Sequence, residues 1–243
     1  MVMVMVMMQE IKVANVAPEV NRDRTLYVDW QDVKIIQNNE VVGIARSTVD
    51  YRTVKNIILP LSTPEAVTVK SQSNAVVSVQ GDKNNSSFTL AAVDEPFWKV
   101  FSFSFNERKP FFREDFESGV KVAVISENVA RQLFKGENAL GKTININFSS
   151  YNIVGVVENV SVLCKAAYSE IWIPYKSLPS YESNYYTCTI LADNKGDFDR
   201  IKQEVMTNQQ KLNSTLSEEQ IDLSGPYDQA TSQLEITSSA EAE

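Results

Sequence analysis

The sequence predicts an α+β protein with two lobes, in which a mostly β lobe is inserted into a lobe of strands and helices. Strand, helix and strand patterns follow one another near both ends of the chain. A mostly β pattern of about a hundred residues separates them. Hydrophobic residues make up 43% of the 243 positions, which suffices for a sizeable core. No repeat of solenoid or propeller period is visible.

The first part of the chain is expected to hold two strands and a helix. Apolar residues alternate with polar ones over residues 26–30, and residues 41–45 form a second short apolar run. From Ser47 we expect a helix, because Ser47 and Asp50 have the spacing of a capping box. The apolar face of this helix comprises Val54, Ile57, Ile58 and Leu61.

The middle of the chain reads as strands followed by a strand, helix and hairpin. Expected strands cover residues 66–69, 75–79, 88–93 and 122–125. Ser126 is placed to cap the next helix, and Gly136 is placed just beyond its end. An alternating strand over residues 144–148 should then turn at residues 149 and 150 and return over residues 153–157.

The last part repeats the strand, helix and strand order. Residues 171–173 form a short strand that Pro174 ends, and residues 177–186 look like an exposed connection. A strand is expected over residues 187–192 and a returning strand over residues 221–223. The helix between them has an apolar stripe made of Phe198, Ile201, Val205 and Leu212.

Composition excludes several classes of function. The net charge is −8 and the basic residues are scattered, which argues against a nucleic-acid partner. The chain has no histidine, so the commonest general base, the Ser-His and Cys-His pairs and imidazole metal ligands are all missing. We therefore expect no enzyme, no catalytic residue, no cofactor and no metal site.

The two cysteines leave two alternatives open. Cys164 and Cys188 are too far apart for a CxxC motif, and two thiolates alone do not complete a structural zinc site. They form either two buried thiols or one disulfide, because sequence does not give the geometry.

Residues 136–143 match the phosphate-binding pattern GxxxxGK[ST]. A phosphate-binding loop follows a strand and opens a helix, so that the helix N-terminus faces the phosphate. Here a helical pattern precedes the loop and an alternating strand follows it. We therefore interpret the segment as a turn from helix to strand, with glycines at positions of unusual backbone geometry.

Two residue groups offer weaker site hypotheses. One group is acidic: Glu114, Asp115 and Glu117 lie beside phenylalanines and would suit a metal site or a glycosidase pair. Such a charge cluster usually forms only a solvent-exposed face. Tyr181, Tyr185 and Tyr186 would suit stacking on a sugar or peptide, although they lie in an expected connection.

The motifs between residues 122 and 157 resemble the periplasmic core domain of MacB-like and FtsX-like ABC transporter permeases. The residues that carry the resemblance are the run 122–126, Ala130, Leu133, Phe134, Gly141, Lys142 and Gly155. Further support comes from residues 24–27, 97–105 and 171–175, so the resemblance spans about residues 20–215. These are structural residues, and none carries chemistry.

The resemblance implies a porter-like lobe of two strand-helix-strand units, interrupted by a second lobe. We assign residues 9–72 and 185–225 to the porter-like lobe and residues 73–184 to the inserted lobe. Residues 226–243 form a polar tail towards the next membrane helix. Residues 1–8, an apolar Met-Val run, are either the remnant of a membrane helix or residues left by an expression vector.

The resemblance further implies a location on the periplasmic side of the bacterial cytoplasmic membrane and no chemistry in this domain. Its expected partners are a cytoplasmic ATPase acting through the membrane helices, a second permease subunit in a dimer, and a periplasmic adaptor or envelope protein. The domain would couple ATP hydrolysis to export, lipoprotein release or transmembrane signalling. The alternative is a stand-alone binding module for a peptide or glycan, and a hydrolase using Glu114 and Asp115 comes last.

Overall fold

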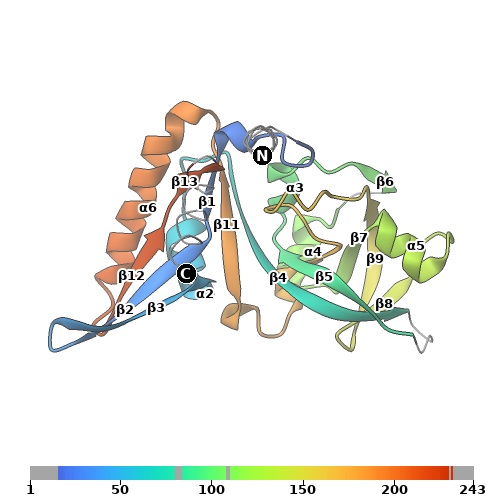
Figure 1. Cartoon of the computed structure of the whole chain (residues 1–243), viewed down its shortest axis with the longest axis horizontal. Coiled ribbons are helices and arrows are strands. Elements are labelled where there is room, and N and C mark those ends of the chain that lie inside the picture. Colours follow the sequence, from blue (N-terminus) through green and yellow to red (C-terminus); the bar gives the residue numbers. More distant parts are fainter. Residues whose placement is uncertain (1–15, 80–83, 108–109, 230, 232–243) are drawn as a thin grey trace, which may run out of the picture. The chain divides into compact units, whose positions relative to one another are not determined.

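The computed structural model describes residues 16–79, 84–107, 110–229 and 231. These residues form two compact units (Figure 1). Unit 1 comprises Asn21–Val69 and the described chain from Glu182 onwards, and unit 2 comprises Val16–Val20 and Lys70–Tyr181. The lobe boundaries that we expected after residues 72 and 184 remain predictions. Residues 1–8 lie outside the described residues.

The first half of unit 1 is a hairpin that leads into a short helix. After β1 (Thr25–Val28), strands β2 (Trp30–Gln37) and β3 (Glu40–Asp50) pair antiparallel along their length. They are joined at Asn38 and Asn39, whose φ angles of 52° and 64° are left-handed values that asparagine tolerates. The chain continues through α2 (Tyr51–Thr53) into a π-helical turn, η2 (Val54–Ile58).

The second half of unit 1 completes its sheets and supplies its long helix. The elements are β11 (Tyr185–Leu191), α6 (Phe198–Asn213), β12 (Glu219–Ser224) and β13 (Tyr227–Asp228). Strand β12 pairs with β2, so β12, β2 and β3 form one antiparallel sheet, while β1 lies between β11 and β13. Helix α6 packs on β12 and η2 (Figure 1), which buries its side chains Ile201 and Val205.

Unit 2 is built on a mixed sheet in the order β4, β5, β10, β7, β9 and β6. The bounds are β4 (Ala66–Val79), β5 (Ser86–Val93), β10 (Ile171–Pro174), β7 (Val122–Ser126), β9 (Ser149–Val157) and β6 (Phe105–Glu107). The pairs β5·β10 and β7·β9 are parallel, and the other three are antiparallel. Strand β8 (Thr143–Ile146) pairs with β4 and β9.

Aromatic side chains fill much of the core of unit 2. Trp172 on β10 is fully buried, and its ring centroid lies 5.4 Å from that of Phe103. Trp98 on α3 (Phe97–Val100) meets the rings of Phe103 and Phe111 edge to face, at 5.1 and 5.4 Å. Such pairs contribute beyond their buried area, so this cluster is expected to add substantially to the stability of the unit. The remaining helices of the unit are α4 (Arg113–Ser118) and α5 (Glu127–Phe134).

Short 3-10 turns connect several of these elements. They are η1 (Arg22–Arg24), η3 (Tyr175–Ser177), η4 (Tyr181–Ser183) and η5 (Lys195–Asp197). The predicted α+β class is confirmed. Within the described residues no helix is both long enough and apolar enough to cross a membrane.

Two local predictions are wrong. The helix expected from Ser47 begins only at Tyr51, because β3 continues to Asp50 and the Asp50 carboxylate accepts the N–H of Thr53 at 2.7 Å as the actual cap. The turn expected at residues 149 and 150 lies at Asn147 and Phe148, with φ angles of 45° and 66°. A left-handed pair at these two positions matches a two-residue hairpin, which the alternating pattern alone did not reveal.

Candidate functional site

The first described segment, Val16–Val20, is held by hydrogen bonds within unit 2. The Pro18 carbonyl accepts the N–H of Ser102 at 2.9 Å. The Glu19 carboxylate, only 4% exposed, accepts the N–H of Ala167 at 3.0 Å. The thiol of Cys164 lies 3.5 Å from the Ala17 carbonyl oxygen. The chain therefore enters the described structure through a segment that is part of unit 2. We call Val16–Val20 the entry segment.

The loop that holds the entry segment is itself bonded to the sheet of unit 2. Lys70 on β4 is 7% exposed and its ammonium donates to the Lys165 carbonyl at 2.7 Å. At the other end of the loop, the Glu170 carboxylate accepts the N–H of Thr89 on β5 at 2.8 Å, and the Thr89 carbonyl accepts the N–H of Glu170 at 3.1 Å. Buried groups with such partners are costly to separate, so the loop is firmly attached to the sheet of unit 2.

The last described strand, β13, is held within unit 1 instead. It pairs antiparallel with β1, with Tyr227 opposite Tyr27 and Asp228 opposite Leu26. The Asp228 carboxylate accepts the N–H and the hydroxyl of Thr231, at 2.9 and 2.8 Å. The backbone hydrogen bond from Thr231 is the largest contribution that lowers the pKa of Asp228 below its ordinary 3.8. We call β13 with this turn the exit strand.

Strand β3 presents an open edge. It pairs with β2 on one side, and β11 joins its other side only at Val49 and Asp50. Over residues 41–47 the described structure therefore places no strand against the outer side of β3. Three apolar side chains of this stretch are more than half exposed, namely Val41, Val42 and Ile44.

As predicted, the segment 136–143 leads from α5 through a turn into β8. Lys135 and Gly136 have positive φ angles of 53° and 92°, and Gly141 has 73°. Amides that a phosphate would need are already bonded, because Gly141 donates to the Ile153 carbonyl at 2.9 Å. The Lys142 ammonium donates to Glu137 at 2.6 Å, and this hydrogen bond lowers the pKa of Glu137. The geometry does not suit phosphate binding.

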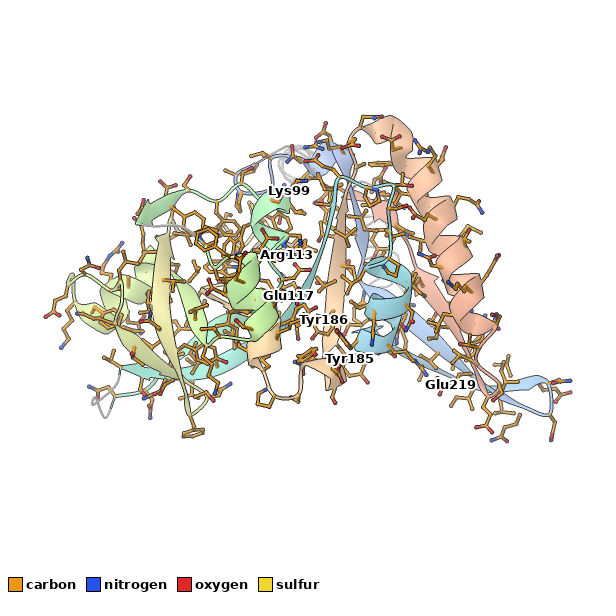
Figure 2. The ribbon with its side chains drawn as sticks, turned by 180° about the vertical axis from the view of Figure 1, so that it is seen from behind. Lys99, Arg113, Glu117, Tyr185, Tyr186 and Glu219 are labelled. Atoms are coloured by element: carbon orange, nitrogen blue, oxygen red, sulfur yellow. The ribbon has the colours of Figure 1, made fainter. Side chains whose placement is uncertain are left out.

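The acidic cluster on α4 is bound into the surrounding structure. The Asp115 carboxylate accepts the N–H of Phe112 at 3.1 Å at the start of the helix. Glu117, labelled in Figure 2 on the same helix, pairs with Lys176 at 2.5 Å, and the Lys176 ammonium also lies 4.9 Å from the centre of the Phe116 ring. Among the described residues no group of three or more His, Cys, Asp or Glu side chains is placed to hold a metal ion. These contacts are those of a helix end, and the hydrolase hypothesis gains no support from them.

The tyrosines do not form a stacking surface. Tyr185 and Tyr186 are consecutive on β11 (Figure 2), and consecutive strand residues point to opposite faces. Tyr186 is 1% exposed and packs near Tyr51 with ring centroids 6.1 Å apart, whereas Tyr185 is 53% exposed. Tyr181 packs against Tyr175 within unit 2.

Cys164 and Cys188 are present as two buried thiols, so the disulfide alternative is not realised in the described structure.

Comparison with known proteins assigns the family. The family model described as "MacB-like periplasmic core domain" matches residues 1–207. The chain belongs to this family. It is accordingly a periplasmic core domain of the type found in MacB-like and YknZ-like ABC transporter permeases.

Individual relatives of this MacB-like domain are distant. The uncharacterised ABC transporter permease YknZ of Bacillus subtilis is 28% identical over 92 residues, which are 38% of this chain and 23% of YknZ. The macrolide export ATP-binding/permease protein MacB of Aggregatibacter actinomycetemcomitans is 26% identical over 95 residues, 39% of this chain and 15% of MacB. The aligned stretches thus cover under a quarter of either relative's length.

A solved structure shares the fold of the MacB-like domain. The crystal structure of the extracellular domain of the noncanonic ABC-type transporter YknZ from Gram-positive bacteria superposes with a TM-score of 0.59. The match covers 80% of this chain and all of that chain, at 15% identity. Identity this low shows the common fold and nothing about a ligand.

The residues that suggested the MacB-like family lie around the strand, helix and hairpin of unit 2. Phe134 is buried at the end of α5, Ala130 and Leu133 are half-buried on the same helix, and Gly155 is buried in β9. Gly141 and Lys142 lie in the turn described above. Their assignment as structural motif residues remains a prediction.

Sequence reasoning missed the entry segment and the open edge of the MacB-like domain. Pro18 and Glu19 belong to no periodic pattern, and only the fold brings them to Ser102 and Ala167. For β3 the apolar run 41–45 indicates a strand, but nothing in it tells that its edge stays uncovered, which depends on where β11 pairs with β3.

Proposed function

We propose that this domain transmits movement of flanking membrane helices to its two units, and so couples ATP hydrolysis in the cytoplasm to work outside the membrane. The outcome would be export, lipoprotein release or transmembrane signalling. The partners are a cytoplasmic ATPase, a second permease subunit and a periplasmic adaptor or envelope protein. Membership of the MacB-like family supports this proposal.

The observation that carries the proposal is the different attachment of the entry segment and the exit strand. Val16–Val20 is part of unit 2, and Tyr227–Asp228 is part of unit 1. Two membrane helices that precede and follow this chain would then be connected, through these segments, to different units. A relative movement of the helices would therefore change the relation between the units, which is a hinge type of transition.

The test is a pair of variants at Glu19 in the full-length permease with its ATPase. Glu19→Ala leaves the Ala167 N–H without its acceptor, which costs about 1–3 kcal/mol locally, whereas Glu19→Gln keeps an acceptor oxygen in place. Spin labels at two exposed positions, Phe148 in unit 2 and Met206 on α6 in unit 1, report the distance between the units by electron paramagnetic resonance. We expect ATP to change the distance distribution in the wild type and in Glu19→Gln, and to change it less in Glu19→Ala.

Two outcomes of the same experiment would contradict the proposal. A distance distribution that does not respond to ATP in the wild type would remove the coupling role, whatever the variants do. An equal response in the wild type and Glu19→Ala would show that the entry segment is not the point of attachment. Circular dichroism of the isolated variants controls for loss of fold.

A further inference from the structure

The loop that holds the entry segment also exposes apolar side chains. Residues 161–164 form a turn, in which the Ser161 carbonyl accepts the N–H of Cys164 at 2.9 Å. The Ser161 hydroxyl oxygen accepts the N–H of Leu163 at 3.2 Å. At the centre of the turn, the side chains of Val162 and Leu163 are 64% and 47% exposed. We call residues 161–164 the apolar turn.

The apolar turn lies beside the entry segment. The buried thiol of Cys164 lies 3.8 Å from the Val16 carbonyl oxygen and 3.5 Å from that of Ala17. The entry segment is itself tightly folded, since Val16 and Glu19 form an isolated antiparallel bridge. Val16 and Val20 are each 37% exposed. We call the four exposed apolar side chains of this region the apolar patch; they are Val16, Val20, Val162 and Leu163.

Hydrogen bonds on the inner side fix the backbone next to the apolar turn. The Cys164 carbonyl accepts the N–H of Tyr168 at 2.7 Å. The Lys165 carbonyl accepts the Lys70 ammonium, also at 2.7 Å, and the Ala167 carbonyl accepts the indole N–H of Trp172 at 3.3 Å. A backbone held in this way keeps Val162 and Leu163 outside the core. Apolar side chains that gather at such a surface mark an interaction site.

The charge of this loop differs from that of the whole chain. The net charge of the chain is −8, yet residues 159–169 contain a single charged residue, Lys165, which is exposed. The acids Glu158 and Glu170 stand only at the two ends of this stretch. The acid of the entry segment, Glu19, is 4% exposed and turned into unit 2. The surface around the apolar patch is therefore apolar with a local positive charge.

We propose that the apolar patch binds the surface of a lipid bilayer, with its apolar side chains at the boundary between headgroups and acyl chains and Lys165 among anionic headgroups. Exposed apolar side chains beside a lysine are the combination that this boundary accepts. Charges are screened over about 8 Å at physiological ionic strength, so Lys165 acts on the headgroups more strongly than acids farther from the bilayer.

The position of the patch favours a bilayer as the occupant. In the proposed function a membrane helix precedes the chain, and its connection to unit 2 is the entry segment, which carries two of the four apolar side chains. The apolar run 1–8 ends eight residues before Val16, and eight residues span at most about 29 Å. This placement beside the membrane rests on the proposed function, whereas binding of lipid by the chain itself does not.

The opposite end of β9 offers a matched control. The loop with the apolar turn follows the end of β9 that pairs with β6, whereas Phe148 precedes the end that pairs with β8. A strand of nine residues is about 30 Å long. Phe148 is fully exposed and apolar, but it stands at the far end of this strand. We expect Phe148 to stay in water while the apolar patch is bound.

The test measures partition of the 243-residue chain into vesicles by flotation, up to about 10 mM lipid. One vesicle type is phosphatidylcholine, and the other contains about one third phosphatidylglycerol. Val162→Ser combined with Leu163→Ser should lower the partition coefficient about tenfold for both types. Phe148→Ser should not change it. Lys165→Gln should lower it about fivefold for the anionic vesicles and leave the neutral ones unchanged.

A fluorescent reporter locates the contact. An environment-sensitive dye attached to Val162→Cys should shift its emission to the blue when vesicles are added, because it enters an apolar surrounding. The same dye attached to Phe148→Cys should show no shift. The native thiols Cys164 and Cys188 are fully buried, so the dye reacts first at the introduced position.

Each contrary outcome overturns the proposal. A wild type that binds neither vesicle type contradicts the bilayer as the occupant and leaves the patch to a protein. Partition that the double variant leaves unchanged, or equal blue shifts at positions 148 and 162, would place the lipid contact elsewhere in the chain. The vesicle experiment needs neither ATP nor the permease, so its failure is distinguishable from a failure of the coupling role. Circular dichroism should show the folded spectrum for every variant, because all the substituted side chains are exposed.

Discussion

The two units differ in where their apolar side chains are exposed. In unit 2 the largest aromatic residues lie in one buried cluster, and most of the exposed apolar side chains, such as Phe148 and Val162, lie in turns and loops, with Val76 on β4 as an exception. In unit 1 three exposed apolar residues, Val41, Val42 and Ile44, are neighbours on β3, where no described strand covers the edge. Unit 2 thus buries its largest apolar side chains in one cluster, whereas unit 1 leaves apolar side chains exposed along the part of β3 that no described strand covers.

The largest effect should come from the core of unit 2. Trp172→Ala removes a fully buried ring that packs on Phe103 and Trp98, and should lower the free energy of unfolding by about 3–5 kcal/mol. The matched control is Trp30→Ala on β2 of unit 1, where the side chain is 44% exposed and the loss should stay below about 1 kcal/mol. Urea denaturation followed by circular dichroism measures both. Equal losses would contradict the contrast between the units.

A smaller effect on stability, which depends on pH, is expected from a carboxylate of unit 1. Burial tends to raise the pKa of Glu204 on α6, but hydrogen bonds from Ser62 and Thr63 outweigh it, so the pKa lies below its ordinary 4.5. A lowered carboxyl pKa stabilises the fold above the ordinary value, and this contribution is lost as the pH falls through the folded pKa. Glu204→Gln should therefore destabilise unit 1 by about 1 kcal/mol at pH 7, a loss similar to that of a helix cap.

The pH dependence of this destabilisation tests whether the carboxylate charge of Glu204 stabilises unit 1. The gap in unfolding free energy between the wild type and Glu204→Gln should shrink once the pH falls below 4.5. Urea midpoints at pH 7, 5 and 3.5 measure it. A gap that is the same at all three values would show that the carboxylate charge does not stabilise unit 1.

The sequence was informative wherever structure depends on nearby residues. The N-cap Ser126 accepts the N–H of Val129 at 3.4 Å. Of the four residues predicted to share a helix face, Val54, Ile57 and Ile58 are fully buried, whereas Leu61 is half-buried and lies beyond the end of η2. The family motifs in residues 122–157 likewise lie in consecutive elements. Local patterns of this kind carry the fold class, because capping and periodicity act over a few residues.

Features that depend on distant residues were not predictable. Glu19 is buried only because the chain returns at Ala167, and no pattern near either residue indicates the contact. Residues 41–45 were identified as a strand, but whether a neighbour covers its edge is decided by where β11 ends its pairing at Val49. The site hypotheses at residues 114–117 and 181–186 arose from composition, which does not specify how side chains converge.

Amide hydrogen exchange of the 243-residue chain tests the central contrast most directly. The account predicts fast exchange for the outward-facing amides of residues 41–47, which no strand of the described structure covers, since alternate amides of an edge strand face away from their neighbour. Residues of β5, β7 and β10 in unit 2 should exchange slowly. Outward amides of residues 41–47 that are protected as strongly as those of the unit 2 strands would contradict the account.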